Sequence, residues 1–384
     1  SLHDNRSAEM VEERDFALVG IPFAAGIAAG LAVSDAVSVR EVHSAASLTY
    51  SATLALAVIL LSGTRRSDPL PRKPGPGIAL LFLICGFFCS ANSFLCGIFP
   101  ENRNNLKWAS EAMGWLSDLL EGMPFSDPGT SALLKALLTG DRSALPKETV
   151  TAFREAGASH ILALSGLHLG IIYLFLSKVT APLGNSPSAR LLRYLLNVGS
   201  SLAYCIATGA GPSLVRAFLF ILIGETAAIL HREKVPTLTL MAAMTVQLAI
   251  EPEVITSLGF QLSYLAMAGI MLVYPHLERI YPGSESAFPG RFDPMRRIWQ
   301  SAMLSISCQL FTGPLAWIRF HSFPKYFIIT NLTALPLTSA VMLLSVCAII
   351  LSALGICPGI LVRIDEYAVR TLVFCLKTIA EIRV

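Results

Sequence analysis

The dominant pattern along the chain is a series of long apolar runs separated by short polar segments. A run of about twenty apolar residues is long enough to cross the hydrocarbon core of a bilayer as an α-helix, which satisfies its own backbone hydrogen bonds. By that criterion we count about ten or eleven candidate transmembrane segments. The clearest are residues 16–39, 45–62, 77–99, 161–179, 194–210, 213–230, 236–250, 257–274, 298–318 and 326–354. The pattern predicts an all-α polytopic membrane protein with some broken or re-entrant segments.

The composition supports this prediction. The chain of 384 residues is 54% hydrophobic and 14% charged, which argues against a soluble protein. Its formal net charge is +3 and the basic residues are spread over short loops, so we expect any polyanionic partner to be held inside the fold. The eight cysteines form no CxxC pair. Most lie in apolar runs, as buried thiols do, whereas Cys96 and Cys357 lie near segment ends, where the sequence leaves their oxidation open.

Basic residues set the expected orientation. The loop at residues 64–75, TRRSDPLPRKPG, holds four basic residues, and such loops lie in the cytoplasm. Counting outward, the basic loops at 177–193 and 231–234 also fall inside. Residues 318–326, IRFHSFPKY, are an exception, an external basic patch with Arg319 and Lys325. The first apolar run lacks a signal-peptidase pattern, so we expect a retained anchor and a cytoplasmic N-terminus.

A three-part organisation follows from the spacing of the apolar runs. Residues 1–99 are expected to form a bundle of three spans, residues 100–159 an external amphipathic segment, and residues 160–384 a channel-like domain. Within the middle part, two tryptophans at helical spacing predict a helix on the lipid headgroups. Two short helices follow, the first beginning at Asp127–Pro128 and the second at Pro146. Residues 360–384 mix charged and apolar positions, as in an interfacial helix.

The segment SHILALSGLHLGIIYLFLSK, residues 159–178, carries polar groups inside an apolar run. Ser165 and His168 are three apart and share a helix face, while Gly166 and Gly170 form a small-xxx-small pair that permits close packing. Two interpretations stay open: His168 bonds to a neighbouring helix, or, with His160, it faces a hydrated path.

The segment ATGAGPSLVRAFLFILIGE, residues 207–225, predicts a helix break with Arg216 one turn later. A membrane arginine either pairs with an acid or meets a transported anion, and both alternatives stay open. Glu225 lies about 180° around the same helix and is a poor candidate partner. Two further segments repeat the pattern, with Gln261 near Gly259 in residues 256–269 and with Gly313, Pro314, Asn331 and Pro336 in residues 313–340. Four interrupted helices indicate a path at membrane depth.

These motifs together resemble the ComEC competence-protein family. HILALSGLHLG, ATGAGPSLVRAFLF, LGFQLSYLA and NLTALPL are similar to four family signatures in the same order, and LLTGDRSALPKETVTAFREAGASH resembles the lead-in to the first. The resemblance implies a bacterial plasma-membrane channel that admits one DNA strand during natural transformation. It also implies membrane lipids and other competence proteins, such as a DNA receptor, a nuclease and a helicase or translocase, as partners.

Two domains of fuller family members are not visible in this sequence. Residues 100–159 are too short and too helical for the oligonucleotide-binding-type β domain, and no metallo-β-lactamase-like region is present. Because no HxHxDH run could bind two metals, we expect no nuclease activity, no metal and no cofactor.

The expected site residues fall into two groups. Those expected to line the DNA path are His160, Ser165, His168, Thr208, Ser213, Arg216, Gln261, Asn331, Arg319 and Lys325. Those expected at helix breaks or close packing contacts are Gly166, Gly170, Gly209, Gly211, Pro212, Gly259, Gly313 and Pro336. In this hypothesis the basic side chains attract phosphates, while the histidine and amide groups line a narrow wet route.

Three rival functions stay open. An intramembrane serine protease would use Ser165 with His168, although two residues of one helix seldom give the linear bond that such a pair needs. A small-solute transporter would also use broken helices, but paired inverted halves are not visible. The third is a membrane scaffold for a separate nuclease or helicase.

Overall fold

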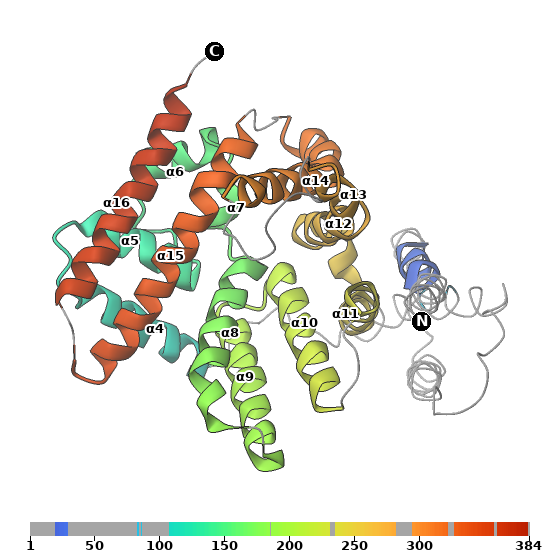
Figure 1. The fold of residues 1–384 in the computed structure, drawn as a ribbon, viewed down its shortest axis with the longest axis horizontal. Helices are drawn as coiled ribbons and strands as arrows, with labels where there is room; N and C mark the ends of the chain where they lie inside the picture. The colour runs from blue at the N-terminus through green and yellow to red at the C-terminus, as the bar shows by residue number, and fades with distance from the viewer. Residues whose placement is uncertain are drawn as a thin grey trace, which may run out of the picture. The chain divides into compact units, whose positions relative to one another are not determined.

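The computed structural model describes residues 20–29, 83, 86, 107–184, 186–230, 235–281, 294–321, 326–356 and 359–382. These residues are helical apart from their connections and contain no strand (Figure 1). The predicted all-α class is therefore confirmed. The labelled α-helices are α4 (Lys107–Glu121), α5 (Pro128–Thr139), α6 (Lys147–Glu155), α7 (Ser159–Leu162), α8 (Gly166–Thr180), α9 (Pro187–Ala207), α10 (Pro212–Ile229), α11 (Pro236–Ile250), α12 (Leu258–Leu272), α13 (Tyr274–Glu278), α14 (Pro294–Phe320), α15 (Phe327–Ala353) and α16 (Gly359–Glu381), with 3-10 turns η2 (Ala181–Leu183) and η3 (Pro252–Thr256).

The chain divides into two compact units. One unit consists of Ser1–Arg103 with Leu230–Gln261, and the other of Asn104–Ile229 with Leu262–Val384. In the first unit, the helix at residues 20–29 packs on α11. The two helices are close at Gly20, where an added Cβ would lie 3.4 Å from Met241 Sδ. Most of the expected three-span bundle at residues 1–99 lies outside the described residues, so that division stays a prediction.

Four helical segments of the described part are long and apolar enough to cross a membrane: Gly166–Leu183, Pro212–Ile229, Pro294–Phe320 and Phe327–Ala353. Shorter apolar helices occur at Gly20–Ala29, α11 and α12. These helices support a polytopic membrane protein. The count of about ten or eleven stays a prediction for the whole chain.

Two of the expected helix breaks do not occur. α14 continues through Gly313 and Pro314, and α15 continues through Pro336. A proline removes one backbone hydrogen bond and crowds the preceding turn, but a long packed helix in a membrane protein can absorb both effects. For residues 326–354 the sequence left open one kinked helix or two half-helices, and the structure has one helix that runs through Pro336.

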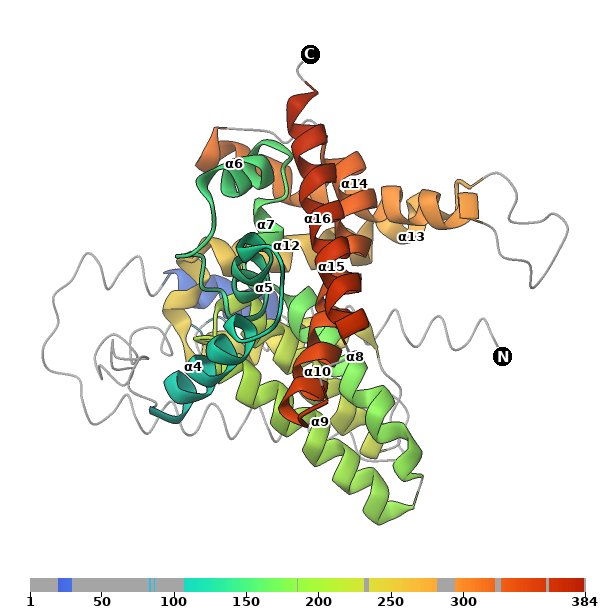
Figure 2. The ribbon, with the colours of Figure 1, turned by 90° about the vertical axis from the view of Figure 1, so that its left-hand side faces the viewer.

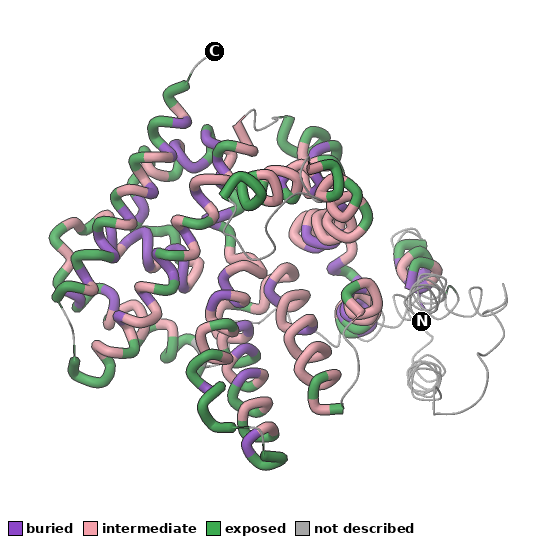
Figure 3. The backbone as a smooth tube through the Cα atoms, viewed as in Figure 1, coloured by how far each residue is buried: buried purple, intermediate pink, exposed green. Residues whose placement is uncertain are grey.

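In the second unit, the main hydrophobic core lies where α5 packs against the antiparallel pair α15 and α16 (Figure 2). Figure 3 shows that buried positions concentrate on α5 and on the facing sides of that pair. The amphipathic stripe of α16 is thus covered by protein. Its buried apolar residues are Val362, Val369, Leu372, Leu376 and Ile379.

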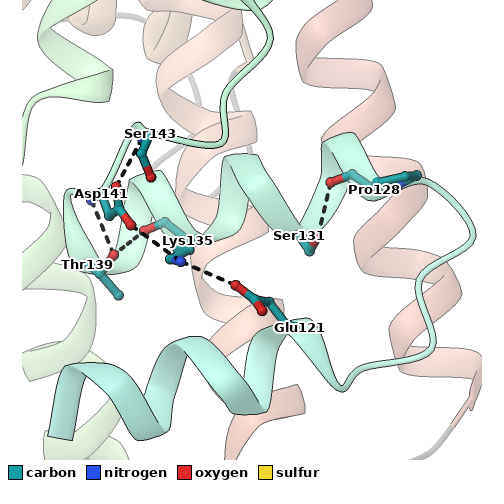
Figure 4. A network of polar contacts seen from close by, with 7 residues as sticks. All are labelled: Glu121, Pro128, Ser131, Lys135, Thr139, Asp141 and Ser143. Atoms are coloured by element: carbon teal, nitrogen blue, oxygen red, sulfur yellow. Dashed lines mark hydrogen bonds and ion pairs between the residues drawn. The ribbon is translucent and has the colours of Figure 1, made fainter. Parts of the chain in front are cut away.

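The ends of α5 follow the predicted signals. Asp127 caps the start by accepting a hydrogen bond from Gly129 N, Pro128 is the first helical residue, and Gly140 ends the helix at φ 83°. Around this end Lys135 bonds to Glu121 of α4 and to Asp141, and Asp141 accepts from Ser143 N (Figure 4). This network fastens the α5–α6 connection to α4.

Candidate functional site

The first part of the site is the start of α8. Ser165 is the N-cap residue of this helix, with its side chain accepting from Leu167 N at 3.3 Å. The chain between α7 and α8 is extended at Ala163 and Ser165. The sequence had placed Ser165 and His168 inside a continuous helix beginning near residue 161, and that placement is wrong because a Ser-x-x-His capping box starts a new helix here.

The ring of His168 is fully buried and held in one orientation. Its Nδ1 accepts a hydrogen bond from Ser165 N at 3.1 Å and lies 3.0 Å from Ser165 Oγ. An Nδ1 atom that accepts leaves the hydrogen of a neutral imidazole on Nε2. This Nε2 atom is buried and has no hydrogen-bond partner among the described residues. His168 therefore presents an unused donor inside the helix packing.

The same geometry bears on the serine protease alternative. The Ser165 Oγ to His168 Nδ1 distance lies within hydrogen-bond range, as a nucleophile and base require. However, Nδ1 has one lone pair, and the Ser165 N–H already points at it. An orienting third group is also missing, because Nε2 has no partner in the described part of the chain. Capping explains the contact more fully than catalysis does.

The second part of the site is the connection between α9 and α10, where the predicted break is present. Thr208 caps the end of α9, Gly209 has φ 86° and Ala210 has φ 48°, and α10 begins at Pro212. Backbone φ in this left-handed region suits glycine, which explains Gly209. The Thr208 hydroxyl donates to Tyr204 O at 2.7 Å, so it is satisfied within its own helix.

Arg216 lies one turn into α10 and is partly buried among neutral groups. Its Nε donates to Ser263 Oγ of α12 at 2.6 Å, and its guanidinium carbon lies 5.9 Å from the centre of the Phe220 ring. The described residues contain no ion pair between Arg216 and a carboxylate. Glu225, a poor candidate partner on helical geometry, instead accepts a hydrogen bond from Tyr173 of α8.

The two helix starts meet at Gly166. A Cβ added to Gly166 would lie 3.2 Å from Arg216 Nη2, 3.2 Å from Ala217 Cβ and 3.9 Å from Ser213 O. The expected close approach at Gly166 is therefore present, whereas a Cβ at Gly170 would meet nothing within 4 Å. Helix N-termini carry partial positive charge, so the α8 and α10 starts and the Arg216 guanidinium together favour an anion.

We call Ser165, Gly166, His168, Arg216 and Ser263 the Arg216 site. α8, α9 and α10, which supply or support most of it, lie side by side in both ribbon views (Figures 1 and 2). α12 is held on α14 by a close contact, since a Cβ at Gly269 would lie 2.3 Å from Ser307 O. The sequence has no signal that pairs Ser263 with Arg216 or Gly269 with Ser307.

Other expected path residues have separate surroundings. Gln261 donates to Ile255 O at 2.9 Å and so closes a local turn at the start of α12. Asn331 has a buried Oδ1 without a partner among the described residues, and the side chains of His160 and Arg319 are exposed. Lys325 lies outside the described residues. The remaining expected positions are Ser213 and Gly211 at the start of α10, Gly259 in the first turn of α12, and the buried Gly313 in α14.

Apolar helices of membrane-spanning length with a cationic site at two helix starts define a polytopic helical membrane protein suited to contact anions. The family described as "Competence protein" matches residues 137–384, and the chain belongs to that family. The predicted family resemblance is thereby confirmed.

Two curated relatives match parts of the chain. ComE operon protein 3 of Bacillus subtilis (strain 168) is 26% identical over 209 residues, which are 54% of this chain and 25% of that protein. Uncharacterized protein YcaI of Escherichia coli (strain K12) is 22% identical over 213 residues, 54% of this chain and 27% of that protein. The chain thus spans about a quarter of the length of these relatives. No solved structure matches it.

Proposed function

We propose that this chain forms the path by which a single DNA strand crosses the plasma membrane of a bacterium during natural transformation. Membership of the competence family supports a role in DNA uptake. The observation that carries the proposal is Arg216, a partly buried cation whose described contacts are a serine hydroxyl and an aromatic ring rather than an acid. Its charge is therefore held in place without being neutralised.

A DNA phosphate suits this site chemically. Guanidinium groups bind phosphate oxygens through two parallel hydrogen bonds, and only the Nε atom of Arg216 is used by Ser263. The starts of α8 and α10 add partial positive charge near the guanidinium. The Phe220 ring offers a surface on which any base can stack.

The small number of basic side chains along the proposed path suits the passage of a strand better than its tight binding. A strand must leave each contact as readily as it enters, so a conduit needs weak, spaced phosphate contacts. In this proposal the exposed Arg319 attracts the strand together with Lys325 of the same basic segment, and Arg216 guides it. Because the sequence has no GxxxxGK[ST] motif, another competence protein, or capture of the emerging strand, supplies the energy. In the proposed topology the N-terminus is cytoplasmic.

The test uses the purified chain in proteoliposomes that enclose a single-strand-binding protein as a trap. Uptake of a fluorescent oligonucleotide is measured for single strands and for duplex. We expect single strands to enter and duplex to stay outside. Arg216→Ala should lower the rate about tenfold or more, because a hydrogen bond to a charged group contributes about 1.5–3 kcal/mol. Arg154→Ala on α6 is the matched control, since Arg154 is exposed and lies away from the site.

The outcomes separate the proposal from its rivals. Equal uptake by Arg216→Ala and the parental chain, with normal insertion of both, would overturn the proposal. Entry of free nucleotides but not of strands would indicate a small-solute transporter. Labelling by a fluorophosphonate that Ser165→Ala abolishes would indicate a hydrolase. Binding of a nuclease or helicase without any strand uptake would indicate a scaffold.

A further inference from the structure

A second ionisable group, remote in sequence from the Arg216 site, lies inside the α5, α15 and α16 packing. The side chain of Asp365 on α16 is 0% exposed. Its Oδ2 atom lies 2.8 Å from Ser345 Oγ of α15. Its Oδ1 atom is buried and has no hydrogen-bond partner among the described residues. An ionised carboxylate with an unpartnered oxygen in such a place is strongly disfavoured.

A count of hydrogens indicates the protonation state. Ser345 Oγ lies 2.8 Å from Asp365 Oδ2 and also 2.8 Å from Val341 O. A hydroxyl has one hydrogen to donate, and an ionised carboxylate and a carbonyl only accept. If Asp365 carries a proton, it donates to Ser345 Oγ and Ser345 donates to Val341 O, so both short contacts become hydrogen bonds.

The charged side chains near Asp365 pair with other groups or are exposed to solvent. α15 carries no Asp, Glu, Lys, Arg or His, and its only ionisable thiol is Cys347. On α16, Glu366 pairs with Arg370 and accepts from Ser126 N at 3.2 Å. On α5, α6 and α16 the remaining charged groups are Lys135, which pairs with Glu121 and Asp141, Glu148 with Lys377, and the exposed Lys147, Arg154, Glu155, Arg363 and Glu381.

Metal ions do not fit the same place. Ca²⁺ and Mg²⁺ need about six oxygen ligands, whereas Asp365 has one hydroxyl neighbour. The described residues contain no group of three or more His, Cys, Asp or Glu side chains that could hold a metal. A proton needs only the one oxygen and the one acceptor that are present.

We propose that Asp365 is a proton-binding site, occupied when α16 is packed on α15 and α5 and emptied only when that packing opens to water. α15 packs against both α16 and α8, so the site is connected through one helix to the helix that carries Ser165, Gly166 and His168. Binding or loss of the proton thereby changes the contact between α16 and α15 at Ser345. The proposal does not depend on what passes through the protein.

The test uses the full chain in nanodiscs and infrared spectroscopy of carboxylic acids. At pH 5 the wild-type chain should show the C=O stretch of a buried protonated carboxyl that exchanges slowly with deuterium. Asp365→Asn should remove this band, and the matched control Asp118→Asn, on the exposed face of α4, should keep it. Absence of the band from the wild-type chain, or its survival in Asp365→Asn, overturns the proposal.

A stability measurement supplies a second, independent readout. Burial raises the pKa of Asp365 above the value of about 3.9 that aspartate has in an unfolded chain. Between these two values folding takes up a proton, and the folding equilibrium constant falls up to tenfold for each unit of rising pH. In detergent, the wild-type unfolding midpoint should therefore be higher at pH 5 than at pH 8, relative to Asp365→Asn. If Asp365→Asn does not fold, Ser345→Ala replaces it: this variant keeps the acid band but shifts its frequency, because the acid has lost its acceptor. An unshifted band in a folded Ser345→Ala chain contradicts the proposed hydrogen bond.

Discussion

Arg216 and Asp365 are both enclosed by helix packing without a partner of opposite charge among the described residues, but burial acts on them in opposite ways. Arginine cannot lose its proton under any ordinary condition, so Arg216 stays charged and is available to an anion. A carboxyl group can become neutral by taking a proton. The partly buried Arg216 thus keeps a charge that an anion can contact, whereas the fully buried Asp365 can lose its charge by binding a proton.

The largest expected effect comes from placing a permanent positive charge at the position of Asp365. Asp365→Arg places a group that cannot become neutral beside Ser345, where the described residues offer no free acid. We expect a loss of about 3–5 kcal/mol in the free energy of unfolding, as for other uncompensated buried charges. Asp365→Asn should fold normally, because its amide can donate to Ser345 Oγ.

Thermal unfolding of both variants in detergent measures this difference. Arg216→Lys is the companion change, because it keeps the charge in the other region, and we expect it to fold like the wild-type chain. Normal stability of Asp365→Arg would show that the Asp365 region tolerates charge and would remove the contrast with Arg216.

The next largest effect is steric and belongs to the Arg216 site. Gly166→Ala adds a Cβ that would lie 3.2 Å from both Arg216 Nη2 and Ala217 Cβ, so the guanidinium or α10 must move. Overpacking of this kind costs about 1–3 kcal/mol, and we expect strand uptake to fall severalfold. Gly170→Ala on the same helix is the matched control, because a Cβ there meets nothing within 4 Å.

The control should be neutral or slightly stabilising, by up to about 1 kcal/mol, since alanine favours a helix over glycine. Uptake rates and unfolding midpoints of the two variants give the comparison directly. Equal behaviour of Gly166→Ala and Gly170→Ala would mean that the position of Arg216 does not govern uptake.

Local signals in the sequence predicted part of this arrangement. The Gly209–Pro212 break could be predicted because two glycines and a proline within four residues strongly disfavour a continuous helix. The start of α5 follows from Asp127 and Pro128. The segments at Gly313–Pro314 and at Pro336 also contain a proline, but α14 and α15 continue through them. The packing of these long helices outweighs the loss of one backbone hydrogen bond. A proline alone therefore does not predict a break.

The partners of the site residues could not be predicted, because they are distant in the sequence. Ser263 is 47 positions from Arg216, and Ser345 is 20 positions from Asp365. Ser165 was expected inside a helix because a Ser-x-x-His capping box lacks the usual glutamate or glutamine. The charge of Arg216 and its position one turn after the helix break were visible in the sequence, whereas its contacts with Ser263 and Gly166 were not.

The smallest effect concerns Asp141, a carboxyl group whose surroundings are the reverse of those of Asp365. Hydrogen bonds from Ser143 and the ion pair with Lys135 hold the pKa of Asp141 below its usual value (Figure 4). Asp141 therefore stabilises the fold above the ordinary aspartate pKa of about 3.9, and this contribution is lost as the pH falls through the lower pKa of the folded protein. Because the side chain is 43% exposed, Asp141→Asn should cost less than about 1 kcal/mol at neutral pH.

The unfolding midpoint of Asp141→Asn, followed from pH 3 to pH 8 against the wild-type chain, measures the sign of this dependence. The gap between the two chains should be widest at neutral pH and should close below about pH 4. The gap for Asp365→Asn should change in the opposite direction, because that carboxyl stabilises the fold only while it holds a proton. A shared direction of change in the two variants would show that Asp365, like Asp141, is ionised in the folded protein.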